Sequence, residues 1–121
     1  MTDYAQAMAD CLGIEGALGA ALVDQSSGMT LATGGDPPAV DLHVAAAGNS
    51  SVVQAKLRTM EALGLDDEIE DILITLGKAY HLINLPKGHP GLFIYLVLDK
   101  SRANLAMARH KLASLSTQIE I

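Results

Sequence analysis

The fold is decided by residues 68–98, EIEDILITLGKAYHLINLPKGHPGLFIYLVL, which predict three consecutive β-strands. Residues 92–98 are apolar on both alternating faces, and a strand of this kind must be covered on both sides. We therefore place it in the centre of a sheet, with helices above and below. Residues 79–85 alternate instead, so that Leu82 is expected to face one side of the sheet and Ile83 the other.

Short turn-forming segments separate these strands. Residues 69–76 predict the first strand, and Gly77-Lys78 after it predicts a type II′ turn, because glycine accepts the positive φ that this turn requires. Residues 86–91 hold two prolines and two glycines, which cannot continue a ladder. We expect the strand at 69–76 to lie at the edge of the sheet, since it opens the meander.

The amino-terminal part of the chain predicts a helix and a hairpin. Thr2 is expected to cap a helix that ends at Cys11 or Leu12. Strands follow at residues 17–24 and 29–33, joined by a short polar connection.

The middle of the chain predicts the longest element. Asp36 as the cap, with Pro37 in the first turn, starts a helix over residues 39–63. Weak helix formers at residues 48–51 predict a bend there or a division into two shorter helices.

A last helix is expected to begin at Asp99 or Ser101, with apolar residues at helical spacing as far as Ile119. The element order is then α-β-β-α-β-β-β-α. This order predicts an α/β (α+β) fold in which a five-stranded, mainly antiparallel sheet carries helices on both faces.

The composition excludes several classes of function. The net charge is −6 and the 8 basic residues are scattered, which disfavours nucleic acid and anionic lipid as partners. One cysteine cannot form an internal disulfide, and no apolar run approaches the ~20 residues that span a bilayer. Without a basic-then-apolar leader, we expect a cytoplasmic protein with no direct membrane insertion.

No pattern of catalytic, cofactor-binding or metal-binding residues stands out. Gly77-Lys78 lacks the upstream glycine and the following hydroxyl of a phosphate loop. The four histidines fall on different predicted elements without metal-ligand spacing. The acidic run at residues 66–71 could be a docking patch or a cation site, but a solvated loop is the favoured interpretation. We expect a protein that is not an enzyme and needs no cofactor.

Two features predict a homodimer. The edge strand has no proline or lysine to stop another chain from adding to it. One flank of the long helix carries small residues and is expected beside that edge. Together they predict a two-fold dimer with a continuous sheet. The expected interface residues are Ala45, Gly48, Val52, Ala55, Thr59, Ile69, Asp71, Ile72, Leu73, Ile74 and Thr75.

The opposite flank of the long helix is polar and is predicted to face outward. It mixes a cation, an anion and small residues, which suits a reversible protein interface, and a merely solvated face is the alternative. Arg58 is the expected anchor, because arginine is enriched at hot spots. The expected partner-binding residues are His43, Ala47, Ser50, Gln54, Arg58 and Glu61.

The ordered pattern resembles the roadblock/LC7 family. The resemblance is carried by GALGAALVD (16–24), SGMTLA (27–32), the alanine-rich helix around 45–47 and the segment 99–109, and it covers nearly the whole chain. It implies one longin/profilin-like domain over residues 1–121, a dimer that joins two sheets edge to edge, and no catalysis. In bacteria such proteins bind small Ras-like GTPases, and this chain is similar to the stand-alone, GTPase-associated bacterial form.

The leading hypothesis is a non-enzymatic dimeric regulator or scaffold that binds a small Ras-like GTPase and modulates its nucleotide cycle or localisation. A sensor kinase or an adaptor of the same pathway is a further candidate partner. The alternative is a PAS/GAF-like small-molecule sensor or a signalling adaptor module. The alanine-rich composition and the few aromatic residues disfavour the sensor, because little remains to converge on a ligand.

Overall fold

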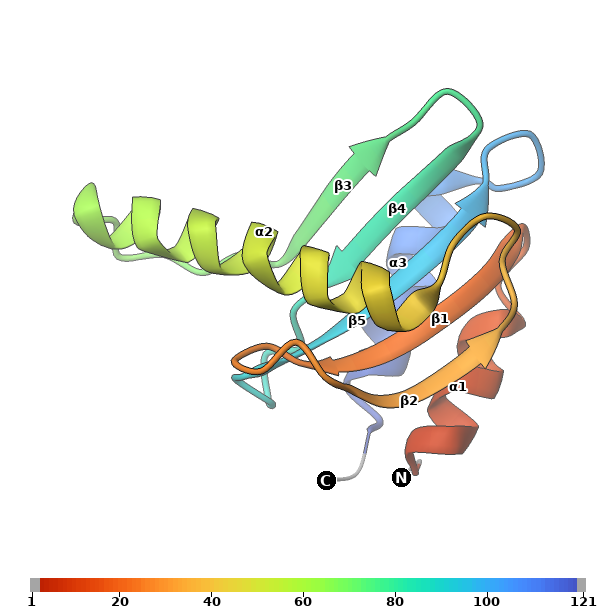
Figure 1. The fold of residues 1–121 in the computed structure, drawn as a ribbon, viewed down its shortest axis with the longest axis horizontal. Coiled ribbons are helices and arrows are strands. Elements are labelled where there is room, and N and C mark those ends of the chain that lie inside the picture. The colour runs from red at the N-terminus through yellow and green to blue at the C-terminus, as the bar shows by residue number, and fades with distance from the viewer. Residues whose placement is uncertain (1–2, 120–121) are drawn as a thin grey trace.

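A computed structural model describes residues 3–119 and confirms the predicted element order (Figure 1). Its sheet has the strand order β2-β1-β5-β4-β3, and every neighbouring pair is antiparallel. The elements are α1 (Tyr4–Leu12), β1 (Ala17–Asp24), β2 (Thr30–Gly35), α2 (Leu42–Ala62), β3 (Asp71–Thr75), β4 (Ala79–Asn84), β5 (Leu92–Asp99) and α3 (Leu105–Ser116).

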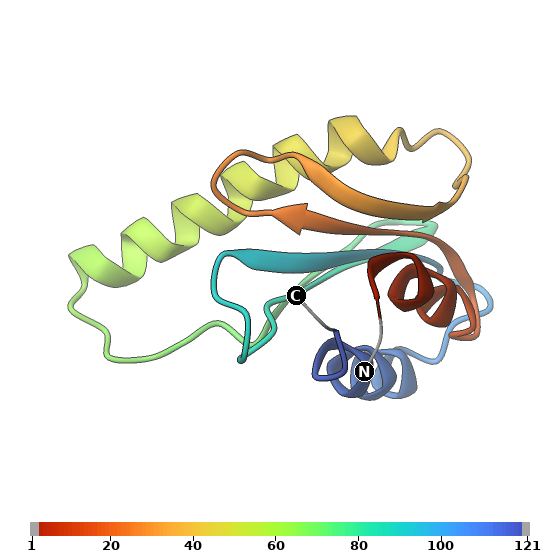
Figure 2. The ribbon, with the colours of Figure 1, turned by 90° about the horizontal axis from the view of Figure 1, so that it is seen from below.

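Strand β5 is the middle strand, as its sequence predicts, and it is buried on both faces. On one face Ile94 and Leu96 pack with α1 and α3, and on the other Phe93 and Tyr95 pack beneath α2. Figure 2 shows these layers, with α2 on one side of the sheet and α1 and α3 on the other. None of the helices in residues 3–119 is both long and apolar enough to cross a membrane.

Strand β4 alternates as expected. Leu82 joins the cluster under α1 and α3, whereas Ile83 joins the cluster under α2. Strand β3 is an edge strand, as predicted, but it covers Asp71–Thr75 rather than residues 69–76. Gly77 does not adopt a positive φ, so the expected type II′ turn is not formed.

The helices begin later than their sequences predict. Asp3 caps α1 by accepting a hydrogen bond from the Gln6 amide at 2.8 Å, while the expected cap, Thr2, lies outside the described residues. Helix α3 begins after Asn104, which accepts from the Met107 amide, rather than at Asp99 or Ser101. The Asp99 carboxylate instead accepts from the Ser101 amide and hydroxyl, which holds the turn before the helix.

Helix α2 starts at Leu42 and not at residue 39. Its cap is Asp41, not Asp36, because the chain first passes through Ala39 at a φ of 60°. The helix then runs for 21 residues without interruption, so the division expected near Gly48 does not occur. Its carboxy-terminal half extends beyond the sheet (Figure 1).

Gly35 holds the end of β2 against β1 at a positive φ of 77°, and a Cβ there would lie 2.5 Å from the carbonyl oxygen of Leu18. We expect Gly35→Ala to lower the free energy of unfolding by about 2 kcal/mol or more, through backbone strain and a steric clash. Gly91 has a positive φ but open space around it, so Gly91→Ala should cost only about 1 kcal/mol.

Urea denaturation measures these differences, with Gly88→Ala as the control. Gly88 has neither a positive φ nor a neighbour within 4 Å, so its substitution should change the free energy of unfolding by less than about 0.5 kcal/mol. Equal losses for Gly35→Ala and Gly91→Ala would show that the close approach of β1 and β2 is not tight.

Candidate functional site

The outer edge of β3 presents unpaired backbone groups. The Leu76 amide donates to the Ala79 carbonyl and the Leu85 amide to the Glu70 carbonyl, at 2.8 and 3.0 Å. Because hydrogen-bonded positions alternate along an antiparallel ladder, every second residue of β3 turns its backbone groups away from β4. The outward-facing residues are Asp71, Leu73 and Thr75.

The expected small-residue flank of α2 is exposed. Gly48 has no neighbour within 4 Å of where a Cβ would stand, and Ala55 and Thr59 are exposed. Val44 and Val52 lie on the same flank and are 69% and 40% exposed. Val44 was not among the residues predicted from the sequence, although its helical spacing from Gly48 and Val52 places it there.

This flank and the β3 edge border the same part of the sheet. Contacts between α2 and the strands concentrate on β1 and β2, which leaves the β3 half of that sheet face uncovered by a helix. Ile72 and Ile74 on β3 are accordingly only half-buried. The structure therefore brings together most of the residues predicted for a homodimer interface, except that Ile69 lies in the loop before β3.

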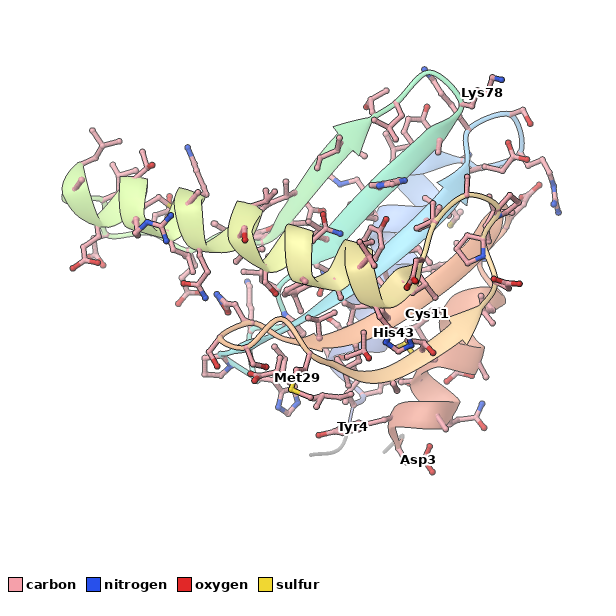
Figure 3. The ribbon with its side chains drawn as sticks, in the orientation of Figure 1. Asp3, Tyr4, Cys11, Met29, His43 and Lys78 are labelled. Carbon is pink, nitrogen blue, oxygen red and sulfur yellow. The ribbon has the colours of Figure 1, made fainter. Side chains whose placement is uncertain are left out.

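The opposite flank of α2 is open only in part. The first residue of β2 and the turn before it contact this flank. His43 Nδ1 lies 2.7 Å from the Thr30 hydroxyl, and Gln54 Nε2 donates to the Gln25 carbonyl in the turn. Ser50 is only 6% exposed, which corrects the expectation that it faces outward. His43 lies over β2, with Met29 in the nearby turn (Figure 3).

Gly28 explains why the turn can approach α2 so closely. It has a φ of 75°, and a Cβ on it would lie 3.1 Å from the Cα atom of Ala47. Of the six residues predicted to bind a partner, His43, Ala47, Arg58 and Glu61 remain exposed. Arg58 forms no ion pair with any side chain described in residues 3–119.

A polar pair lies between β4 and β5 on the face of the sheet that α2 covers. The Tyr95 hydroxyl and His81 Nδ1 are 2.9 Å apart, and their rings meet edge to face. Burial lowers the pKa of His81 and raises that of Tyr95. Nearby, Nδ2 of Asn49 on α2 is buried without a hydrogen-bond partner.

The other candidate groups do not assemble a reactive centre. The described side chains contain no group of three or more His, Cys, Asp and Glu residues that could hold a metal ion. Burial, with a smaller effect of Asp10, raises the pKa of the Cys11 thiol to about 12, which keeps it protonated. In the acidic run, Asp71 is tied to Arg109 of α3 by two hydrogen bonds of 2.9 Å, a role the sequence does not reveal.

The architecture matches known structures along nearly its whole length. A roadblock/LC7 domain from Streptomyces avermitilis superposes with a TM-score of 0.82 over 97% of this chain and 94% of that one. The chain has the roadblock/LC7 fold. The identity to that domain is 14%, so the likeness lies in the fold. No protein-family model matches the sequence, and no curated protein matches it either.

Two MglB structures share this roadblock/LC7 fold. MglB from Myxococcus xanthus has a TM-score of 0.77 at 16% identity, covering 93% of this chain and 90% of that one. The gliding protein MglB from Thermus thermophilus has a TM-score of 0.69 at 19% identity, covering 93% and 87%. The expected fold is thereby confirmed.

The half-buried His81 predicts a stability that depends on pH. Its pKa in the folded chain lies below the ordinary 6.5, so the unfolded chain binds a proton first as the pH falls. The free energy of unfolding should therefore fall as the pH drops from about 6.5 to the lower folded pKa. His81→Gln keeps a partner for the Tyr95 hydroxyl but cannot be protonated, and it should flatten this decline.

Urea denaturation at about pH 7.5 and about pH 5.5, at one protein concentration, measures the decline. His89→Gln is the control, since His89 lies in the loop before β5 and should leave the decline unchanged. An equal decline in the unmodified protein and in His81→Gln would assign the pH dependence to other groups.

Proposed function

We propose that this chain is a non-enzymatic regulator of the roadblock/LC7 type, with one domain over residues 1–121. It pairs with a second copy and binds a small Ras-like GTPase in the cytoplasm, where it modulates the nucleotide cycle or the location of that GTPase. The observation that carries the proposal is the open β3 edge beside the exposed small-residue flank of α2. The sequence resemblance supplies the class of partner.

A two-fold axis beside the outer edge of β3, level with its middle residue, would let two copies of the edge pair with each other. Leu73 is the central outward-facing residue, so two copies can pair antiparallel with Leu73 opposite Leu73 and Asp71 opposite Thr75. The two sheets then continue into one. On each copy, the uncovered sheet face beside the paired β3 strands carries the half-buried Ile72 and Ile74. This face receives the α2 flank of the second copy, whose small residues allow close packing.

Leu73→Pro tests the pairing of the two β3 strands. The substitution removes an amide that points away from β4, so it should block addition of the second β3 while the β3–β4 hairpin remains. Leu73→Ala removes the same side chain but keeps the amide, and it should remain a dimer. Multi-angle light scattering and sedimentation measure the mass of each variant. The pairing is wrong if the unmodified protein is a stable monomer or if Leu73→Pro remains a dimer.

In such a dimer the two α2 helices lie side by side and form a platform across the axis. The flank nearer the β1–β2 turn then faces outward through His43, Ala47, Arg58 and Glu61. These residues present charge and small side chains without a large apolar patch, which suits a reversible interface of about 800 Å² per partner. A GTPase bound there would contact both copies and would depend on their pairing.

Arg58→Glu tests the platform. An unpaired arginine is a suitable anchor, and reversing its charge should weaken binding to a Ras-like GTPase of the same organism at least tenfold, or about 1.4 kcal/mol. Arg102→Glu, in the loop after β5, is the matched control and should bind normally. Calorimetry measures both affinities, and light scattering checks that both variants remain dimers. Unchanged affinity in the Arg58→Glu dimer would show that the GTPase binds another surface of the protein.

A further inference from the structure

A small polar cleft lies between the β1–β2 turn and α2. It has a volume of about 250 Å³, with the turn from Gln25 to Gly28 on one side and α2 on the other. Gly28 brings the two walls together, as its φ and its distance from Ala47 require. The cleft is therefore built by the fold of the chain and does not depend on the positions of long surface side chains.

One polar group in the wall of the cleft has no hydrogen-bond partner within the chain. Ser50 is 6% exposed, and its hydroxyl has no hydrogen-bond partner. Gln25 is 9% exposed, and its backbone carbonyl accepts from Gln54. A buried hydroxyl without a partner costs free energy, because it has given up its hydrogen bonds to water. A ligand that accepts a hydrogen bond from Ser50 would recover this loss.

Arg58 also lines the cleft and supplies an unpaired positive charge there. The nearest carboxylate in sequence on the turn, Asp24, does not line the cleft. Its oxygens accept hydrogen bonds from Ser27 at 2.6 Å and from Ser26 at 3.4 Å, which lowers the pKa of Asp24 and holds its charge within the turn. The groups left for a ligand are the hydroxyls of Ser50 and Ser51 and the guanidinium of Arg58.

We propose that this cleft binds the carboxylate of an aspartate or glutamate side chain carried by a protein that docks on α2. The fork of a guanidinium matches a carboxylate, and hydroxyl donors complete its hydrogen bonds. A free anion would have to approach a chain of net charge −6, whereas a carboxylate on a docked partner is brought in by the surrounding contacts. The proposal rests on the proposed function in that the docked protein is the GTPase.

The test uses a small probe in place of the partner. N-acetyl-aspartate methylamide is titrated into the full-length ¹⁵N-labelled protein, and N-acetyl-asparagine methylamide, which has the same shape without the charge, is the control ligand. The acid should shift the backbone amide signals of Ser27, Ser50 and Ser51 saturably in the millimolar range, and the amide should not. Equal shifts with both ligands, or no saturable shift with the acid, would overturn the proposal.

Variants identify the groups that bind the probe. Arg58→Gln should weaken binding of the acid at least about tenfold, while Arg102→Gln, a cation elsewhere on the surface, should leave it unchanged. Ser50→Ala should also weaken binding but should not lower the free energy of unfolding, because it removes a buried hydroxyl that has no partner. A stability loss in Ser50→Ala with unchanged probe affinity would make Ser50 merely structural.

Inorganic phosphate is the second probe. Binding of phosphate at these residues more tightly than the aspartate analogue would identify a free-anion site and would overturn the assignment to a partner side chain. The titrations require neither the second copy nor the GTPase. A negative result in these titrations would not contradict the dimer or the GTPase platform. If the platform failed but the acid still bound, the cleft would remain a carboxylate site and only the identity of the docked protein would be wrong.

Discussion

A strand without a polar face is the constraint on which this structure depends. Every side chain of β5 from Phe93 to Leu98 is apolar or aromatic and buried, so both faces of the sheet must be covered. Helices α1 and α3 cover one face and α2 covers the other. Because α2 lies toward β1 and β2, the cover is complete at one end of the sheet and incomplete at β3. The candidate site is the part of the sheet that the chain does not cover.

The sequence predicts the strands and their places well, because burial leaves a local pattern. The apolar run of β5 and the alternation of β4 are read directly from neighbouring residues. The position at which a helix begins depends less on neighbouring residues. Asp36 followed by Pro37 has the composition of a helix start, yet Pro37 is buried against Gly19 and the chain turns through Ala39 before Asp41 begins α2. Tertiary packing overrides the local signal there.

In the candidate site too, features with a local sequence pattern were predicted and contacts between distant segments were not. The β3 edge and the small-residue flank of α2 follow from periodicity and were predicted, apart from Val44. The covering of Ser50 and Gln54 by the β1–β2 turn was missed, because it joins segments far apart in the chain. Its one local signal is the glycine in Ser27-Gly28, whose positive φ lets the turn approach Ala47. The Asp71–Arg109 pair spans 38 positions, and no spacing rule predicts it.

The open edge also bears on how the chain avoids aggregation. An unpaired strand with the sequence DILIT is a template for any extended chain, and its one charge, Asp71, is held by Arg109 and cannot act as a gatekeeper. Two edges related by a two-fold axis saturate each other, whereas head-to-tail addition would leave a new edge at every step and grow into a fibre. In a chain with this edge, the proposed two-fold pairing would close the edge and prevent such growth.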